Sequence, residues 1–358
     1  MFTLLVINPG STSTKIALFR DDTPLFTASL PHSSEELAPF TTIYSQYGFR
    51  RQAILKILEE KGIMLEEIDA FVGRGGLLHP VTSGTYRVGL AMLNQLEKAD
   101  FGEHASNLGA ILAHELAAPY GRPAFIVDPV VVDELDPEAR LTGHPLLPKQ
   151  CIFHALNHKA VGRKAAGQLG KPYDALNLII AHLGGGISVA AHRHGRVVDV
   201  NNALNGDGPF SPERSGTLPA KALVRLCFSG RYSEHEISRM ITGKGGVVAY
   251  LGVNDMRLVT SMIQQGDAKA LLVYRTMAGQ VAKEIGGMAT VLNGEVDAIV
   301  LTGGIAYDEE FIGLIRAHVA FIAPVLLFPG EEEMEALALG GLRVLRGEEE
   351  AKEYNELS

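Results

Sequence analysis

The strongest constraint on the fold is a repeat within the chain. The segment LLVINPGSTSTKIALF, from Leu4, aligns without a gap with LIIAHLGGGISVAAHR, from Leu178. In both copies an apolar run ends in a polar turn that contains glycine, and a second apolar run follows, which is the pattern of a β-hairpin. A further short strand is expected after each hairpin, at residues 24–30 and 196–200. The chain is therefore expected to contain one three-stranded unit twice.

A second pair of segments extends the repeat. IDAFVGRGGLL, from Ile68, matches VDAIVLTGGIA, from Val296, at five positions that include both glycines of the turn. Each copy continues into an apolar pattern of helical period, at residues 108–118 and 311–322, and then into another short apolar strand. Three strands, a helix, a strand, a helix and a strand thus occur twice. This order predicts an α/β fold of two duplicated domains of the βββαβαβα type.

The predicted first domain covers residues 1–150 and the second covers 151–336, with a final helix at about 337–358 that returns to complete the first. Two facing domains of this kind would enclose a cleft, and the glycine-rich turns after their strands would face into it. Residues 201–252 belong to an insertion that only the second copy carries, rich in glycine, arginine and polar residues. This insertion is expected to supply loops of the active site.

Composition excludes several classes of function. The 358 residues are 46% hydrophobic and 20% charged, which is typical of a globular chain with a large core. A formal net charge of -9 argues against nucleic acid or an anionic membrane as the main partner. Neither a signal-peptide pattern nor an apolar run long enough for a membrane span is evident, so a cytoplasmic location is expected. The two cysteines have no CxxC spacing that would indicate a zinc or redox site.

Two turns of the repeat have the composition of phosphate-binding loops. NPGSTSTK gives the first domain an amide, several hydroxyl groups and an ammonium beside exposed backbone N–H groups, although an ordinary polar hairpin turn is the alternative. HLGGG, at the equivalent position of the second domain, has three glycines that let backbone N–H groups approach a phosphate closely. The candidate ligands are Asn8, Ser11, Ser13 and Lys15 in the first turn and His182, Gly184, Gly185 and Gly186 in the second.

Two arginines are candidates for binding the phosphoryl group, one after a strand of the first domain and one in the insertion. Arg74 occupies the VGRGGLL turn, where a surface arginine in a loop is the alternative, and Arg214 lies in ERSG. A migrating phosphoryl group carries dispersed negative charge, which positioned guanidinium groups stabilise. The LTGGIA turn, with Gly303, Gly304 and Ile305, would admit a nucleoside against flat backbone. These residues predict phosphoryl transfer from a nucleotide.

Histidines and carboxylates near these turns are the remaining candidates. FHALNH places His154 and a second histidine on one helical face, but no third metal ligand is evident, so His154 is interpreted as a hydrogen-bond donor to a phosphoryl oxygen. Asp128 and the cluster 331–333 follow corresponding strands and could bind Mg²⁺ through oxygen. A capping role for Asp128 and a helix-dipole role for the glutamates are alternatives. His192 and His194, in HRH, are expected to be solvated at a hairpin tip.

Together these motifs resemble the acetokinase family, within the superfamily that includes sugar kinases, actin and heat-shock chaperone ATPases. VINPGSTSTK, VGRGGLLHP, IFHALNH, HLGGGISVAAH, ERSG, GKGGVVAYLGVNDMR and LTGGIA follow in the family order over nearly the whole chain. The resemblance implies an actin-like ATPase, ribonuclease H-like fold with an active-site cleft between the domains. It also implies a carboxylate kinase that uses ATP with Mg²⁺, and a homo-oligomer.

The resemblance also implies roles for individual residues. Phosphate and metal contacts fall to the NPGSTSTK turn, carboxylate or transition-state contacts to Arg74 and Arg214, and transition-state hydrogen bonding to His154. His104, in HASNLG, matches the family's other active-site histidine segment, although the segment here is one residue shorter.

For the metal, the resemblance implies Asn8, Asp128 and Glu333, although the local alignment equally allows Glu332 instead of Glu333. Asp128 is given an active-site role as well.

Departures from the family pattern concern the substrate. Acetate kinases typically have HLGNG, HGTSH and TRSGDIDP, where this chain has HLGGG, HALNH and ERSGTLP, and these replacements resemble the butyrate kinase branch of the family. Selection by alkyl length would come from an apolar pocket near Phe153, Val81 and Phe210, with Phe153 as the candidate substrate contact. Each added methylene contributes only ~1 kcal/mol in such a pocket, so neighbouring acids are expected to react too.

The sequence therefore predicts reversible phosphorylation of butyrate by ATP, with direct in-line transfer and with ATP or ADP and a short-chain carboxylate or acyl phosphate as partners. A kinase of acetate, propionate or a branched acid is the nearest alternative. More remote alternatives are a sugar kinase, in which Asp128 would be the general base, and an ATP-binding switch without catalysis.

Overall fold

The structure is a computed structural model that describes residues 1–355. The chain divides into two compact units. Unit 1 is formed by Met1–Asp133 together with the chain from Glu332 onward, and unit 2 is formed by Glu134–Glu331. No helix within residues 1–355 is long and apolar enough to cross a membrane.

Unit 1 is built on a seven-stranded sheet with the strand order β12-β5-β6-β4-β1-β2-β3. The first three strands form an antiparallel meander, and β4 and β6 add parallel strands beside β1. β1 and β4 are buried along almost their whole length, as expected of inner strands covered on both faces. The strands are β1 (Thr3–Pro9), β2 (Ser13–Arg20), β3 (Thr23–Pro31), β4 (Ala70–Arg74), β5 (Thr85–Arg87), β6 (Ala124–Val127) and β12 (Lys352–Glu353).

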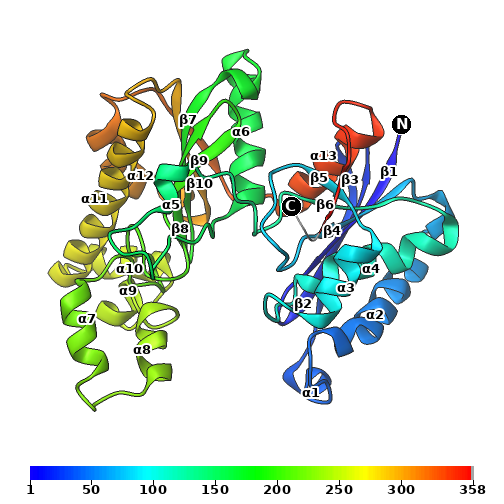
Figure 1. The fold of residues 1–358 in the computed structure, drawn as a ribbon, viewed down its shortest axis with the longest axis horizontal. Coiled ribbons are helices and arrows are strands. Elements are labelled where there is room, and N and C mark those ends of the chain that lie inside the picture. Colours follow the sequence, from blue (N-terminus) through cyan, green and yellow to red (C-terminus); the bar gives the residue numbers. More distant parts are fainter. Residues whose placement is uncertain (356–358) are drawn as a thin grey trace. The chain divides into compact units, whose positions relative to one another are not determined.

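Two helices cover opposite faces of this sheet. On one face, α4 (Asn107–Ala117) comes so close that a Cβ on Gly73 would lie 2.1 Å from the Gly109 carbonyl oxygen. On the other face, α13 (Glu333–Leu345) brings Gly341 against Val72. Val72 is the residue before Gly73 in β4, so its side chain points to the face of the sheet opposite α4. Unit 1 also contains α1 (Ser34–Leu37), α2 (Tyr47–Glu60) and α3 (Leu90–Lys98) (Figure 1).

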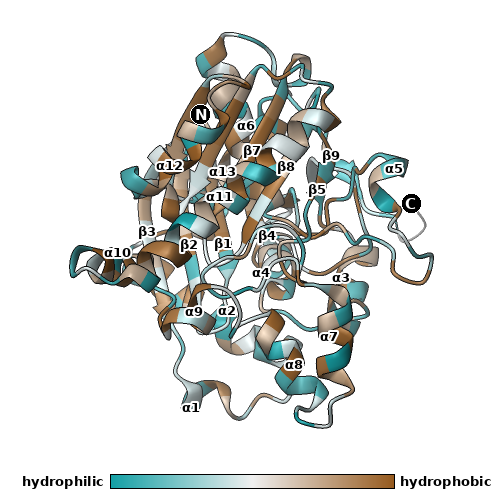
Figure 2. Cartoon of the chain, turned by 90° about the vertical axis from the view of Figure 1, so that its left-hand side faces the viewer, coloured by the Kyte–Doolittle hydropathy of each residue, from teal (hydrophilic) through white to brown (hydrophobic). Residues whose placement is uncertain are grey.

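Unit 2 contains a five-stranded sheet with the order β11-β10-β7-β8-β9. Hydrophobic residues run along β7 and β8, which lie inside this sheet (Figure 2). Helix α6 (Ala155–Leu169) packs beside β7, whereas α11 (Ala268–Val291) and α12 (Glu309–Val319) lie on the other side (Figure 1). The strands are β7 (Asn177–Leu183), β8 (Ile187–Arg193), β9 (Arg196–Val200), β10 (Ala298–Gly303) and β11 (Val325–Pro329).

The insertion after β9 alternates short helices with irregular loops. It contains α7 (Ala220–Cys227), α8 (Glu234–Ile241), α9 (Val247–Leu251) and α10 (Met256–Gln264), and it leads into α11. Because α7 buries no residue, this part of the insertion lies on the surface of unit 2. The long helix α11 supplies ten buried residues to the core of unit 2. It is the helix predicted between the third and fourth strands of the repeat, where unit 1 has α2, although its bounds were not predicted.

The predicted duplication is confirmed. The order β3-β2-β1-β4-β6 in unit 1 is the same as the order β9-β8-β7-β10-β11 in unit 2, and each inner pair is parallel. The predicted third strands, at 24–30 and 196–200, correspond to β3 and β9. The predicted α/β fold class is therefore correct.

The boundary between the units lies at Asp133 and Glu134, earlier than the position near residue 150 that the sequence suggested. Contacts with unit 2 explain the difference. The Glu134 carboxylate accepts hydrogen bonds from Lys159 Nζ at 2.5 Å and from the Val197 backbone N–H at 3.0 Å. Lys149 Nζ lies 2.6 Å from Asp199 Oδ1. The segment 134–150, which includes α5 (Pro137–Arg140), is thus tied to unit 2 at both ends.

Candidate active site

The NPGSTSTK turn joins β1 to β2 in unit 1. Asn8 on β1 is the cross-strand partner of Lys15 on β2, so their side chains emerge side by side on the same face of the hairpin. The Gly10 backbone N–H donates to the Ser13 carbonyl at 2.7 Å and closes the turn. Ser11 is exposed and Ser13 is half-buried. The four predicted phosphate ligands of unit 1 therefore lie together at one end of one hairpin.

Arg74 and Glu333 complete this group. Arg74 ends β4, next to β1, and its Nη1 lies 2.9 Å from both carboxylate oxygens of Glu333. The Asn8 amide donates to Glu333 Oε2 at 2.7 Å and accepts from Arg74 Nη1 at 3.3 Å. Of the two glutamates considered for the metal, Glu333, the first residue of α13, is thus the one in contact with Asn8. Its carboxylate also fixes the Arg74 guanidinium, which stays 36% exposed.

His104 belongs to the surroundings of Arg74. Desolvation, and after it the positive charge of Arg74, lowers the pKa of the His104 imidazole. Its Nδ1 lies 2.8 Å from Ser106 Oγ, just before α4. A neutral imidazole next to Arg74 is compatible with the role that the family resemblance implies for His104.

Asp128 makes a different kind of contact. Its carboxylate accepts a hydrogen bond from the Gly84 backbone N–H at 2.7 Å, and the residue is 1% exposed with φ of +38°. This contact holds the turn that enters β5. The contact with Gly84 tests neither interpretation of Asp128, so the capping role and the metal role both stay predictions.

In unit 2 the HLGGG turn lies against the insertion. A Cβ on Gly186 would lie 1.9 Å from Arg214 Nη1, so the guanidinium passes directly over this glycine. Arg214 donates to the Ala203 carbonyl, and Ser211 Oγ donates to the Gly185 carbonyl at 2.6 Å. The predicted phosphate turn of unit 2 and the predicted catalytic arginine of the insertion are therefore neighbours.

His154 lies beside the same turn. Its ring stacks on that of His182, with 3.8 Å between ring centroids, and its Nδ1 lies 2.8 Å from Ser188 Oγ. Ser188, on β8, also contacts His158 Nε2 at 2.8 Å. Stacking and hydrogen bonding thus fix the orientation of the His154 imidazole. Ser188 has no feature in the sequence that would have identified it as the link between two histidines.

A buried chain of polar groups continues from Ser188. His158 Nδ1 lies 3.3 Å from His192 Nε2, and His192 Nδ1 lies 2.7 Å from the hydroxyl of Tyr173. Both histidines are 0% exposed, and burial, reinforced by nearby positive groups, holds their pKa values well below the usual range. The expectation that His192 is solvated was wrong, because His192 lies on the inner strand β8, paired with Leu178 and Val197, and not at the hairpin tip; His194 is exposed as expected.

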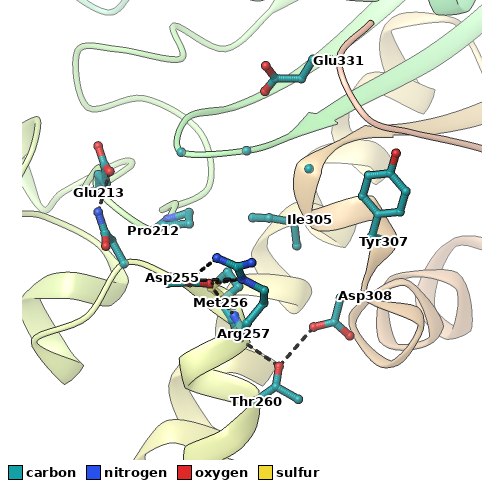
Figure 3. A pocket seen from close by; sticks show the side chains of 14 residues that line it. Pro212, Glu213, Asp255, Met256, Arg257, Thr260, Ile305, Tyr307, Asp308 and Glu331 are labelled. Atoms are coloured by element: carbon teal, nitrogen blue, oxygen red, sulfur yellow. Dashed lines mark hydrogen bonds and ion pairs between the residues drawn. The ribbon is translucent and has the colours of Figure 1, made fainter. Parts of the chain in front are cut away.

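A pocket of about 680 Å³ opens next to the HLGGG turn in unit 2 (Figure 3). Backbone of the two glycine turns forms part of its wall, and Arg257, paired with Asp255 at 2.7 Å, projects from the first turn of α10. Glu331 lies 3.4 Å from His182 Nε2. The lining residues are Gly184, Gly185, Pro212, Glu213, Asn254, Asp255, Met256, Arg257, Thr260, Gly304, Ile305, Tyr307, Asp308 and Glu331.

The shape of the pocket follows from glycine at one position. Gly303, at the end of β10, has φ of +89°, and a Cβ there would lie 2.4 Å from the Leu183 carbonyl oxygen. Only glycine lets the two turns approach so closely. A pocket with flat backbone on one side and a few polar side chains on the other is suited to a nucleoside. Asn254, Asp255 and Arg257 were not singled out from the sequence, although the GVNDMR segment that contains them had been matched to the family.

The three residues expected to line an acyl pocket are each buried within their own unit. Phe153 is 2% exposed, and its ring meets the edge of His158 at 5.3 Å between centroids. Phe210 packs near Tyr250, and Val81 forms a bridge with Val132 in unit 1. Phe153 therefore supports the buried histidines, and the acyl pocket stays a prediction.

The residues expected to bind Mg²⁺ can be tested against the geometry. Within residues 1–355 no cluster of three or more histidine, cysteine, aspartate or glutamate side chains could hold a metal ion. Asn8 and Glu333 nevertheless bring an amide side chain and a carboxylate together, because the Asn8 amide N–H donates to Glu333 Oε2. Mg²⁺ in kinases is commonly held by one or two carboxylates together with substrate phosphates and water. The Asn8 and Glu333 pair fits that pattern.

Comparison with known proteins agrees with this geometry. The model of the acetokinase family matches residues 147–322. Butyrate kinase 2 of Clostridium acetobutylicum is 54% identical over 353 residues, which are 99% of each chain. Butyrate kinase 1 of the same organism is 54% identical over 354 residues, or 99% of this chain and 100% of that one.

A solved structure has the same fold at low sequence identity. The crystal structure of Porphyromonas gingivalis acetate kinase superposes with a TM-score of 0.79 at 21% identity, covering 96% of this chain and 100% of that one. The duplicated order of strands, the two turns and the similarity over the whole length agree with one another. The chain belongs to the acetokinase family.

Proposed function

We propose that this chain transfers the γ-phosphoryl group of ATP to butyrate and forms butyryl phosphate and ADP in a reversible reaction. Membership of the acetokinase family makes it an ATP-dependent kinase of short carboxylates. The choice of butyrate rests on one observation, the 54% identity to butyrate kinases over 99% of the chain.

The nucleotide is assigned to unit 2. The pocket beside the two glycine turns has the flat backbone wall that a nucleoside needs, and the HLGGG turn presents backbone N–H groups to its phosphates. Arg214, fixed over Gly186, places a guanidinium next to this turn. We assign to it the stabilisation of charge on the migrating phosphoryl group.

Unit 1 contributes Arg74, Asn8, Glu333 and the serine and lysine side chains of the first turn. Arg74, oriented by Glu333, pairs with the carboxylate of the acid. Asn8 and Glu333 would hold Mg²⁺, which supplies positive charge to the phosphate oxygens. His104, next to Arg74, is a further donor for the acid or the phosphoryl group.

The chemistry is a direct in-line transfer. A carboxylate oxygen attacks the γ-phosphorus while the bond to the oxygen that bridges to the β-phosphorus breaks, so no proton has to leave the acceptor at neutral pH. His154, held by His182 and Ser188, donates a hydrogen bond to a phosphoryl oxygen. A carboxylate acceptor needs no general base, whereas a sugar hydroxyl does. Asp128, the candidate base for a sugar kinase, accepts a hydrogen bond from the Gly84 backbone N–H, and this favours the carboxylate acceptor.

The test is an acyl phosphate assay trapped with hydroxylamine, with ATP, Mg²⁺ and separately acetate, propionate, butyrate, isobutyrate and valerate. Highest kcat/KM with butyrate is expected. A maximum at acetate or at a branched acid would keep the kinase and overturn the choice of substrate. Absence of product with every acid, from folded protein that binds ATP, would overturn the proposed reaction. The cytoplasmic location, the homo-oligomer and the absence of nucleic-acid and membrane partners stay predictions.

A further inference from the structure

A buried arginine lies beneath the first phosphate turn. Arg50, on α2, is 0% exposed, and its guanidinium reaches the inner side of the turn between β1 and β2. Nη1 donates to the Gly10 carbonyl at 2.9 Å, the Ser13 carbonyl at 3.2 Å and Thr14 Oγ1 at 3.0 Å. Nη2 donates to the Ser11 carbonyl at 3.4 Å. One side chain thus holds four of the five residues from Gly10 to Thr14.

The charge of Arg50 has no counterion in the described part of the chain. Its remaining hydrogen bonds run from Nε and Nη2 to Gln46 Oε1, at 3.2 and 2.9 Å, and no carboxylate pairs with it within residues 1–355. His32, which contacts Thr14 Oγ1 at 2.9 Å, has its pKa lowered by burial and by the nearby Arg50 charge. Burial of a cation without an anion is unfavourable. An anion that binds the turn from outside would relieve this cost.

The hydrogen bonds of Arg50 also decide which way the turn amides point. In a trans peptide the C=O and N–H groups point in opposite directions, and residues 1–355 contain no cis peptide bond. Because the Gly10 and Ser11 carbonyls point inward at Arg50, the N–H groups of Ser11 and Thr12 point outward. Both residues are exposed, and neither N–H group has an acceptor within residues 1–355. Successive outward N–H groups are a preformed anion site.

We propose that Arg50 is a positioning residue that makes the turn from Gly10 to Thr14 a preformed site for the phosphoryl group of an acyl phosphate or of ATP. It acts from behind the turn, by directing two N–H groups outward and by adding a buried positive charge. This inference rests on the proposed function for the identity of the anion, but not for the existence of the site.

The test compares Arg50→Met, which keeps the apolar stem without charge or donors, with Arg50→Lys, which keeps the charge with different donor geometry. Leu58→Ala is the matched control, since Leu58 is 1% exposed two turns further along α2 and belongs to the core. For each variant, kcat and KM for butyryl phosphate are measured at saturating ADP, together with the ADP Kd and the unfolding temperature.

In Arg50→Met the KM for butyryl phosphate should rise about tenfold or more, as expected when hydrogen bonds to a charged group are lost, with the ADP Kd unchanged. Arg50→Lys should lie between this variant and the wild type. Leu58→Ala should lower the unfolding temperature and leave both constants unchanged. If folded Arg50→Met keeps the wild-type KM, or if its ADP Kd changes by the same factor as KM, Arg50 is a purely structural residue and the inference fails.

A direct binding experiment separates this inference from the proposed reaction. Calorimetric titration of inorganic phosphate into the ADP-saturated protein does not require turnover. Weaker phosphate binding in Arg50→Met than in the wild type would support the site even if butyryl phosphate is no substrate. Equal phosphate affinity in the two proteins would overturn it even if the kinase reaction is confirmed.

Discussion

Arg214 and Gly186 are in contact so close that the glycine cannot be replaced without moving the arginine. A Cβ at residue 186 would lie 1.9 Å from Nη1, at the far end of the arginine side chain. Since a flexible end group can shift, the fold would tolerate the change, but the guanidinium would leave its position over the HLGGG turn. The neighbouring Gly185 is different, because a Cβ there has its nearest contact at 4.0 Å, to Glu213.

Gly186→Ala should therefore lower kcat about a hundredfold, the size of effect typical for removing one positioned group that stabilises transition-state charge. The unfolding temperature should change by only a few degrees. Gly313→Ala, in α12, where an added Cβ meets no atom within 4 Å, is the control and should keep near wild-type turnover. Steady-state kinetics with butyrate and ATP decide the matter, and a Gly186→Ala enzyme with normal kcat would remove Arg214 from the proposed chemistry.

At the scale of elements, α6 and β8 meet through polar groups inside unit 2. His158 on α6 and His192 on β8 are buried in the neutral state, and their pKa values lie well below the usual one. An unfolded chain would protonate both near pH 6.5 and below. The unfolded state therefore binds more protons than the folded state in this range, so stability is complete above about pH 6.5 and falls as the pH is lowered towards the folded-state pKa values.

We expect the free energy of unfolding to decrease between about pH 6.5 and pH 5 with a contribution of up to two protons from this pair. Chemical denaturation at a series of pH values measures it. His192→Gln should reduce the slope by about one proton, whereas His235→Gln, at an exposed position of α8, should leave the slope unchanged. A slope that is insensitive to His192→Gln would contradict the buried neutral state of this residue.

The elements differ in how far the sequence predicted them. The strands of the repeat were predictable because inner strands are continuous apolar runs, such as LLVI before Asn8 and LIIA before His182. The bounds of α11 were not predicted, because the insertion separates α11 from β9, whereas α2 follows β3 closely in unit 1. Arg50 also escaped, because RRQAILKILEE reads as a helix with solvated arginines, and the sequence does not show that the turn from Gly10 to Thr14 lies over that face.

At the scale of the whole molecule, duplication has produced two sheets of the same order whose first turns differ in chemistry. The turn of unit 1 has hydroxyl groups, a lysine and a buried arginine behind it, whereas the turn of unit 2 has three glycines and an arginine from the insertion. The two units are thus expected to bind different ligands.

Hydrogen exchange can test whether the two units bind different ligands. ADP alone should protect backbone amides at residues 184–186, 254–260 and 304–308, which surround the pocket of unit 2. Butyryl phosphate alone should protect residues 10–14 of unit 1. The measurement is exchange followed by mass spectrometry with each ligand separately. Protection of residues 10–14 by ADP as strongly as the pocket residues would contradict the assignment of the nucleotide to unit 2.

Helix α13 follows unit 2 in the chain, although it covers the sheet of unit 1. A ribosome therefore completes unit 2, which is one continuous segment, before it makes the helix that packs against Val72 and Val127. Until then the nascent first sheet has one apolar face without its cover. Because synthesis runs from the N-terminus, the strands of unit 1 emerge first but unit 1 is completed last. A translation stop after residue 331 would release a protein with a complete unit 2 and an aggregation-prone unit 1.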